Sequence, residues 1–456
     1  EEDVKKAALL YEESARGRSP DGICALGVLH IQGKGVPEDE AKAAELFRQN
    51  IRYFLKWTFI SAISGVTIGL AGTLFGLGIQ KATAFWKSHS WTLYLLPLVG
   101  LLIVWLYRFA HEEKNRGTDM VLDSISSTEE VTPATAPLIF ISTLLSHLAT
   151  ASVGREGAAL QLGGSLGNLI GKAFRLDEKD RKIAIMCGMS AGFSAIFGTP
   201  LTAAVFAMEV ISIGVMYYAA LVPCVFSAFV GVSVAKFLGL APEHYEIGLV
   251  PEFGASSALL TVLIGILCAC VGIFLCVSLH QCGHAYRKVF PNPYIRVLAG
   301  SAIFIVLTLL FPARLYNGSG AQIIEMVFEG EKIPVYAFLM KILFTGVALG
   351  AGFKGGEIVP TLTVGAAFGY LMSLVTGLPV GLCASVGMAC LFVSVTNCPV
   401  STMFMAFELF GFAAMPYYAI AVAVCFTLSG YYGLYHIQKF VYSKIRTEFI
   451  NRKSNE

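Results

Sequence analysis

Charged side chains are scarce in this sequence. Of its 456 residues, 14% are Asp, Glu, Lys or Arg and 55% are hydrophobic, whereas a soluble globular chain carries about 25% charged residues. No Asp, Glu, Lys, Arg or His lies between Glu357 and Glu408, and residues 210–235 and 254–279 carry no charge. A spanning helix needs about 20 apolar residues. The composition therefore excludes an ordinary soluble domain and predicts several membrane helices.

Signals for other functional classes are also missing. The net charge is +2 with no basic cluster, so no nucleic acid partner is predicted. The eleven cysteines lie mostly in apolar runs, where Cys behaves as a small buried hydrophobe. Cys268, Cys276 and Cys282 with His280 and His284 fit no familiar zinc spacing. We predict no metal and no cofactor, and no nucleophile–base–acid arrangement that would indicate an enzyme.

The first 50 residues differ from the rest of the chain. They hold many of its charges, and residues 24–27, 33–37 and 41–47 have the pattern of helix, Gly-rich turn and helix. The segment resembles a SEL-type repeat, a relative of the tetratricopeptide repeat. Solenoid repeats usually need about three units, so either more repeats precede residue 1 or this helical pair docks elsewhere. It is a protein-interaction arm with an unidentified partner, or a structural cap.

Residues 51–456 form the predicted transmembrane domain, with the first spanning helix beginning near Ile51. Gly and Pro interrupt many of its apolar runs. In lipid, backbone groups freed by such breaks must be satisfied inside the protein or by a cavity, and transporters bind substrates at broken helices. The basic residues after the last apolar run, in residues 439–453, favour a cytoplasmic C-terminus for a multi-pass protein of the cell membrane.

An internal repeat is the strongest structural signal. Gly188, Pro200 and Glu209 recur as Gly387, Pro399 and Glu408 at one constant offset (408 − 209 = 199). We therefore predict an all-α integral membrane protein of two homologous halves, about 51–250 and 251–456, with broken helices at mid-membrane. Inverted topology is typical of such an architecture. A pore or transport site is expected where the halves meet.

Glu156 is the principal candidate for chemistry. A carboxylate within a membrane segment usually faces a cavity and is functional. Glu156 stands directly before a predicted helix start at Gly157 and Ala158, where unpaired N–H groups and the helix dipole favour an anion. The ionised glutamate occupies that site itself, and the protonated one yields it to an anion. One residue can then couple anion movement to proton movement. The alternative is a structural ion pair with Arg155.

The second half has a matching break at residues 355–360. Pro360 suits the first turn of a helix, where its missing N–H costs nothing. The N–H groups around Glu357, Ile358 and Val359 are then expected to face the same central ion. The carboxylate of Glu357 is expected to pair with Lys354.

These motifs are similar to those of a known family. Residues 154–157, Gly-Arg-Glu-Gly, match the glutamate-gate motif of CLC chloride channels and transporters, and residues 356–360 stand where that family has a second glycine-to-proline motif. The surroundings of Glu209 and of Tyr435 also resemble the family. The likeness covers about residues 53–445.

The resemblance implies a homodimer with a separate anion pathway in each subunit. It places the gate at Glu156, a coordinating hydroxyl at Tyr435 and a first-half contact on the loop 117–119. Together with the two helix starts, the expected anion-binding residues are Gly154, Arg155, Gly157, Ala158, Thr118, Glu357, Ile358, Val359 and Tyr435.

Some positions depart from the chloride-type pattern. Thr118 replaces a serine, Ile358 replaces a phenylalanine, and Val210 stands where many proton-coupled members carry an inner glutamate. The segment 356–360 is closer to the fluoride-exporting branch. The favoured function is exchange of a halide, fluoride or chloride, for protons. A passive voltage- or proton-gated chloride channel and a membrane-anchored interaction protein are the alternatives.

Overall fold

The computed structural model describes residues 2–16, 20–127, 130–311 and 314–455. The chain divides into two compact units, Glu1–Ile63 and Ser64–Glu456, and α3 (Glu40–Ser88) carries residues of both. The helix that we expected to begin near Ile51 begins at Glu40 instead, so the predicted boundary between residues 50 and 51 lies inside a helix.

The first unit is a small helical assembly of α1 (Glu2–Arg16), α2 (Pro20–Gln32) and the start of α3. Ala8, Leu26 and Ala43 are among its buried residues. A Cβ atom at Gly27 would lie 3.2 Å from the ring of Phe47, so the small residue allows α2 to approach α3 closely.

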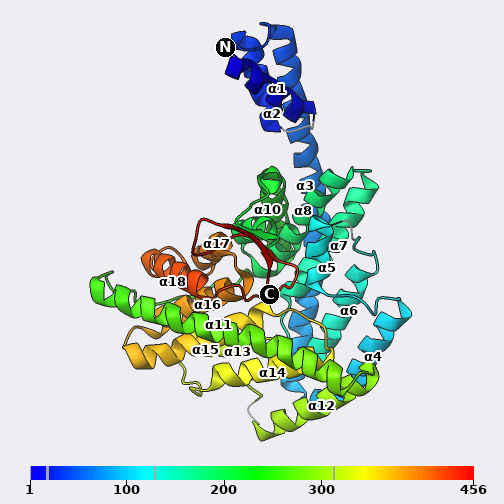
Figure 1. The fold of residues 1–456 in the computed structure, drawn as a ribbon. Helices are drawn as coiled ribbons and strands as arrows, with labels where there is room; N and C mark the ends of the chain where they lie inside the picture. The colour runs from blue at the N-terminus through cyan, green and yellow to red at the C-terminus, as the bar shows by residue number, and fades with distance from the viewer. Residues whose placement is uncertain (1, 17–19, 128–129, 312–313, 456) are drawn as a thin grey trace. The chain divides into compact units, whose positions relative to one another are not determined.

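The second unit is a helical membrane domain (Figure 1). Six helices of the described chain are long and apolar enough to cross a bilayer, and further apolar helices are shorter. The all-α fold class is confirmed. The elements after α3 are η1 (Ser90–Leu95), α4 (Leu96–Phe109), α5 (Thr118–Ser126), α6 (Thr135–Leu148), α7 (Glu156–Ala173), α8 (Glu178–Phe197), α9 (Pro200–Glu209), β1 (Ser212–Ile213), η2 (Tyr218–Ala220), α10 (Leu221–Phe237), α11 (Ala255–Val289), α12 (Pro293–Leu310), α13 (Ala321–Phe328), α14 (Ala337–Ala351), α15 (Ile358–Thr376), α16 (Val380–Thr396), α17 (Pro399–Phe410), α18 (Met415–Leu428), β2 (Lys439–Tyr442) and β3 (Phe449–Lys453).

Two helix pairs are built alike in the two halves. In α7 and α8, a Cβ atom at Gly163 would lie 2.2 Å from the carbonyl oxygen of Gly188, and in α15 and α16 one at Gly365 would lie 2.6 Å from that of Gly387. Small residues allow the backbones of membrane helices to approach this closely. Each broken segment is thus followed by a helix fixed tightly to the next one.

The repeated glutamates exchange partners between the halves. Glu209, at the end of α9, accepts hydrogen bonds at the start of α17 from the N–H groups of Val400 (3.1 Å) and Ser401 (2.8 Å). Glu408, in α17, accepts them at the start of α9 from the N–H groups of Leu201 and Thr202, each at 2.9 Å. Every partner is related to its counterpart by the same offset of 199 residues (400 − 201 and 408 − 209). This reciprocity is what two related halves around a pseudo-twofold axis would produce.

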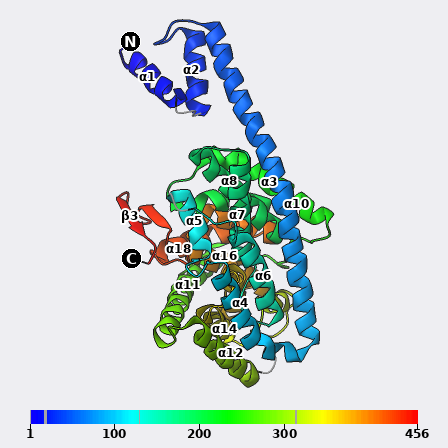
Figure 2. The ribbon, with the colours of Figure 1, turned by 90° about the vertical axis from the view of Figure 1, so that its right-hand side faces the viewer.

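The C-terminal segment returns to the first half. Strand β1, which follows α9, pairs in parallel with β2, and β2 pairs antiparallel with β3. Figure 2 shows β3 beside the C-terminus. The side chain of Gln438 donates to the carbonyl oxygens of Thr396 (2.7 Å) and Val210 (3.0 Å). The sequence did not predict this small sheet.

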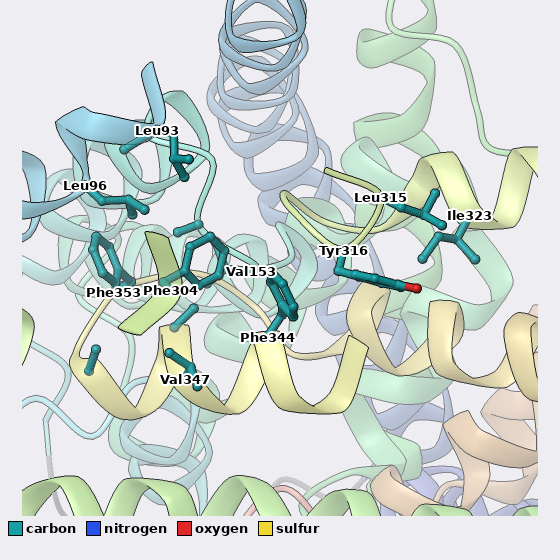
Figure 3. Packing of buried hydrophobic residues seen from close by; sticks show 14 of the residues in the cluster. Leu93, Leu96, Val153, Phe304, Leu315, Tyr316, Ile323, Phe344, Val347 and Phe353 are labelled. Carbon is teal, nitrogen blue, oxygen red and sulfur yellow. The ribbon is translucent and has the colours of Figure 1, made fainter. Parts of the chain in front are cut away.

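An apolar core cluster fixes both broken segments. It includes Leu96, Phe304 and Phe344, together with Val153 and Phe353 (Figure 3). Val153 precedes the first break by one residue, and Phe353 precedes the second. The same packed core therefore positions both breaks.

Candidate functional site

The two breaks form one structure. Gly154 and Gly356 are paired as an antiparallel bridge, with N–H to oxygen distances of 2.7 and 2.6 Å. A Cβ atom at Gly356 would lie only 2.5 Å from the amide nitrogen of Gly157, so the approach leaves no space for a side chain. Helix α7 begins just after one break and α15 just after the other, which brings a helix N-terminus from each half to the same place.

Glu156 is completely buried at the start of α7. Its Oε2 accepts a hydrogen bond of 3.1 Å from the backbone N–H of Arg155, and its Oε1 lies 3.2 Å from Arg155 Nε. The carboxylate therefore lies at the helix start, where the following residues Gly157 and Ala158 are also buried. The ion pair that we considered as the alternative role is present in this conformation.

Arg155 contacts a second carboxylate. Its Nη2 donates to Glu243, and the hydroxyl of Tyr245 donates to the same carboxylate at 2.8 Å. These three residues line one side of a cavity of about 320 Å³ that also contacts Lys87 and Val359. Two backbone hydrogen bonds, from Glu243 to Phe197 (3.2 Å) and from Tyr245 to Leu409 (2.9 Å), hold the loop in place. Glu156 thus shares its cation with a carboxylate at the edge of a cavity.

Glu357 occupies the N-cap position of α15. The expected pair with Lys354 is wrong, because the Lys354 ammonium lies over the ring of Tyr107, 4.4 Å from its centroid. Glu357 instead lies within electrostatic range of Asp119. Ile358 and Val359, which follow it, are buried. Two acidic side chains, Glu357 and Asp119, therefore lie near each other at the second break.

The loop residues of the first half reach the same place. Thr118 Oγ1 lies 3.4 Å from the carbonyl oxygen of Gly157 and accepts a hydrogen bond of 3.3 Å from Gln161. The carboxylate of Asp119 lies beside the backbone amides of His436 and Ile437 in the C-terminal segment. One oxygen of Asp119 has no hydrogen-bond partner among the described residues.

Tyr435 completes the group from the C-terminal segment. It is buried, and it lies within electrostatic range of Glu357 and Asp119. The backbone N–H of its neighbour Leu434 donates to Val395 at the end of α16 (2.9 Å). The structure thus gathers residues from both halves and from the C-terminal segment around the two helix starts.

Two residues near the site were not assigned to it from the sequence. Glu243 lies 87 positions after Glu156, in a loop whose pattern carries no signal. Lys341, in α14, is fully buried and donates to Ser152 Oγ (2.9 Å) and to the carbonyl oxygens of Gly318 (2.7 Å) and Tyr316 (3.2 Å). Because Ser152 lies just before the first break, this lysine supports the break structurally.

Comparison with known proteins gives consistent matches. The family described as "Voltage gated chloride channel" matches residues 99–430. A "Chloride/fluoride channel protein" of Pseudomonas syringae pv. tomato is 35% identical over 399 residues, which cover 86% of this chain and 88% of that protein. A solved "CLC-type fluoride/proton antiporter" superposes with a TM-score of 0.81 at 30% identity, covering 84% of this chain and 98% of that one. A "slow cyanobacterial Cl-/H+ antiporter" shares the fold, with a TM-score of 0.69 at 17% identity, over 82% of this chain and 94% of that one.

Proposed function

Because this chain belongs to the voltage-gated chloride channel (CLC) family and is therefore a multi-pass membrane anion transporter, we propose that it exchanges halide ions for protons, with fluoride favoured over chloride. The observation that carries the proposal is the buried carboxylate of Glu156 at the start of α7, beside the bridge that joins the two breaks. Likeness to a protein named as a fluoride/proton antiporter supports fluoride and proton exchange.

Glu156 acts as the gate in this proposal. When ionised, its carboxylate occupies the helix start, where in the present conformation it accepts a hydrogen bond from the backbone N–H of Arg155. Protonation removes the negative charge that the helix start favours, and the side chain can then yield its place to an anion. The ionised carboxylate and the transported anion thus compete for one position, and protonation of Glu156 decides which of them occupies it, which links proton and anion movement.

The anion that replaces the carboxylate is bound by neutral groups. The donors we assign are the N–H groups of the segments 155–158 and 357–359 and the hydroxyls of Thr118 and Tyr435. The N–H of Gly154, which we had also expected to contribute, is instead hydrogen-bonded to the carbonyl oxygen of Gly356 (2.7 Å). Arg155 stays beside the site through Glu243. Selectivity between halides depends on cavity size and on the number and field strength of such donors. Fluoride requires more of its hydration to be replaced than chloride does, so close polar contacts favour it.

A passive channel is the second candidate. Val210, where many coupled relatives of the resembled type carry a second glutamate, is fully buried, and its carbonyl oxygen accepts from Gln438. Without a second carboxylate there, protons need another route, and Glu156 would then gate anions alone.

We further propose that the protein is a homodimer with a cytoplasmic C-terminus, and that residues 1–50 form a SEL-type interaction arm.

Flux from purified protein in liposomes tests the proposal. Vesicles loaded with fluoride or chloride, with and without a pH gradient, distinguish exchange from passive flow. An antiporter moves protons uphill when an anion gradient drives it. Anion flux that leaves the internal pH unchanged would instead support the channel.

A further inference from the structure

A second cationic cavity lies away from the two helix breaks. It measures about 310 Å³ and lies where α4, α12 and the end of α14 meet. Three cationic side chains line it: Arg108 near the end of α4, Arg296 in the first turn of α12, and Lys354 after α14. Its only carboxylate among the lining residues is that of Glu113. None of these residues belongs to the proposed anion pathway.

The positive charge of this cavity is not balanced. Arg108 and Glu113 form an ion pair of 3.7 Å in which both side chains are largely exposed, 67% and 62%, so the pair is weak. The ammonium of Lys354 lies over the ring of Tyr107, and the Arg296 guanidinium repels it electrostatically. Among the described residues, neither Arg296 nor Lys354 has a carboxylate partner. Two like charges held together in a partly buried cavity are costly unless an anion compensates them.

The cavity lies at one end of two candidate membrane spans. The span Ser90–Phe109 ends one residue after Arg108, and the span Pro293–Leu310 begins three residues before Arg296. Apolar side chains of α4, Ile103 and Val104, line the same cavity one turn further into the span. Basic pockets between spanning helices at this depth are suited to the headgroups of anionic lipids.

We propose that this cavity binds a phosphate group through Arg108, Arg296 and Lys354. Two planar guanidinium forks and one compact ammonium match the oxygens of a phosphate better than a monatomic halide. The phosphate is supplied by an anionic phospholipid, whose glycerol backbone would contact Ile103 and Val104, or by free phosphate. The site is independent of which halide the protein transports.

Binding here would act on the helix break that follows. Lys354 is two residues before Gly356, whose N–H and carbonyl groups are both bonded to Gly154. A phosphate bound to Lys354 would therefore restrict the motion of the backbone from Lys354 to Gly356, which positions both helix starts. This links the lipid environment to the transport site through one short stretch of backbone.

Thermal unfolding of the purified chain of residues 1–456 in an uncharged detergent tests the proposal. The probes are dihexanoyl-phosphatidylglycerol, inorganic phosphate and sodium chloride, each titrated at matched ionic strength. We expect phosphatidylglycerol, inorganic phosphate or both to raise the unfolding temperature in a saturable way. A response to the lipid alone identifies the headgroup as the source, and a response to both shows that free phosphate suffices.

Variants distinguish the cavity from general electrostatics. Arg296→Gln should weaken the apparent affinity roughly tenfold, and Arg296→Lys should restore part of it. Lys288→Gln, an exposed position at the end of α11 outside the cavity, is the matched control and should behave as wild type. The proposal is overturned if neither phosphate probe has an effect, if sodium chloride reproduces it, or if Arg296→Gln leaves it unchanged.

Discussion

Gly154 and Gly356 each donate a backbone N–H to the other's carbonyl oxygen, at 2.7 and 2.6 Å, across a separation of 202 positions (356 − 154). Through this exchange the break in the first half and the break in the second half cannot move independently. Glu156 follows Gly154 by two residues, and Glu357 follows Gly356 by one. The bridge between the glycines therefore fixes the positions of both carboxylates relative to each other.

The first prediction concerns the gate. Glu156→Gln should abolish proton coupling, because an amide cannot exchange a proton, while anion flux falls or continues uncoupled. Parallel measurement of halide efflux and internal pH in liposomes checks this. Proton movement that persists at the wild-type rate would show that another group carries the proton.

Selectivity gives the second prediction. We expect fluoride efflux to exceed chloride efflux clearly in liposomes loaded with either ion, because close polar donors favour the smaller and more strongly hydrated halide. Ion-selective electrodes in the same vesicle preparation provide the measurement. Chloride efflux equal to or faster than fluoride efflux would favour a chloride-type transporter.

The third prediction concerns the carboxylate that shares Arg155. Glu243→Gln leaves the guanidinium to Glu156 alone, so the gate should be held more firmly and both fluxes should fall together. Hydrogen bonds to charged groups are worth about 1.5–3 kcal/mol, so we expect a decrease of roughly tenfold. Tyr245→Phe should act in the same direction but more weakly.

Glu246→Gln is the control for this loop, since Glu246 is exposed and three positions from Glu243. Its fluxes should match those of the wild type. If Glu243→Gln accelerates exchange, Glu243 does not compete for Arg155 in the way the geometry suggests.

The fourth prediction is one of stability. Glu209→Gln should destabilise the protein by about 1–3 kcal/mol, because a neutral amide replaces a carboxylate that accepts from two backbone N–H groups and a hydroxyl. Glu408→Gln should have a similar effect at the other half. Thermal unfolding in detergent measures both.

Glu178→Gln serves as the comparison, because it removes an exposed carboxylate that pairs with Lys182 at 3.5 Å. Exposed pairs contribute little, so its unfolding temperature should hardly change. If Glu178→Gln and Glu209→Gln lowered the unfolding temperature equally, the buried carboxylate would contribute no more to stability than an exposed one.

The sequence predicted the frame of the site better than its contacts. The residues around Pro200 recur around Pro399 at a constant spacing, so the two halves could be recognised. Glu156 was recognisable as a carboxylate close to two glycines in a mostly apolar region. The role of Glu243 was not predictable, since its contact with Arg155 depends on how a loop 88 residues away folds back.

The Lys354 prediction failed for a local reason. Opposite charges three residues apart pair readily within a helix, but Lys354 lies between α14 and α15, where no helical geometry applies. An aromatic ring from α4 was available instead. Likewise, the strand Ser212–Ile213 is too short to give a sequence pattern, and only the distant strand β2 defines it.

The exchanged glutamates determine when each half of the protein can finish folding during synthesis. Thr202 meets the carboxylate of Glu408 206 positions later in the chain, so the ribosome delivers the first half long before its cap exists. Until then the N–H groups at the start of α9 lack their carboxylate, which is costly in lipid. We expect the newly inserted first half to remain loosely packed in the bilayer, and either half synthesised alone to be cleared by membrane proteases.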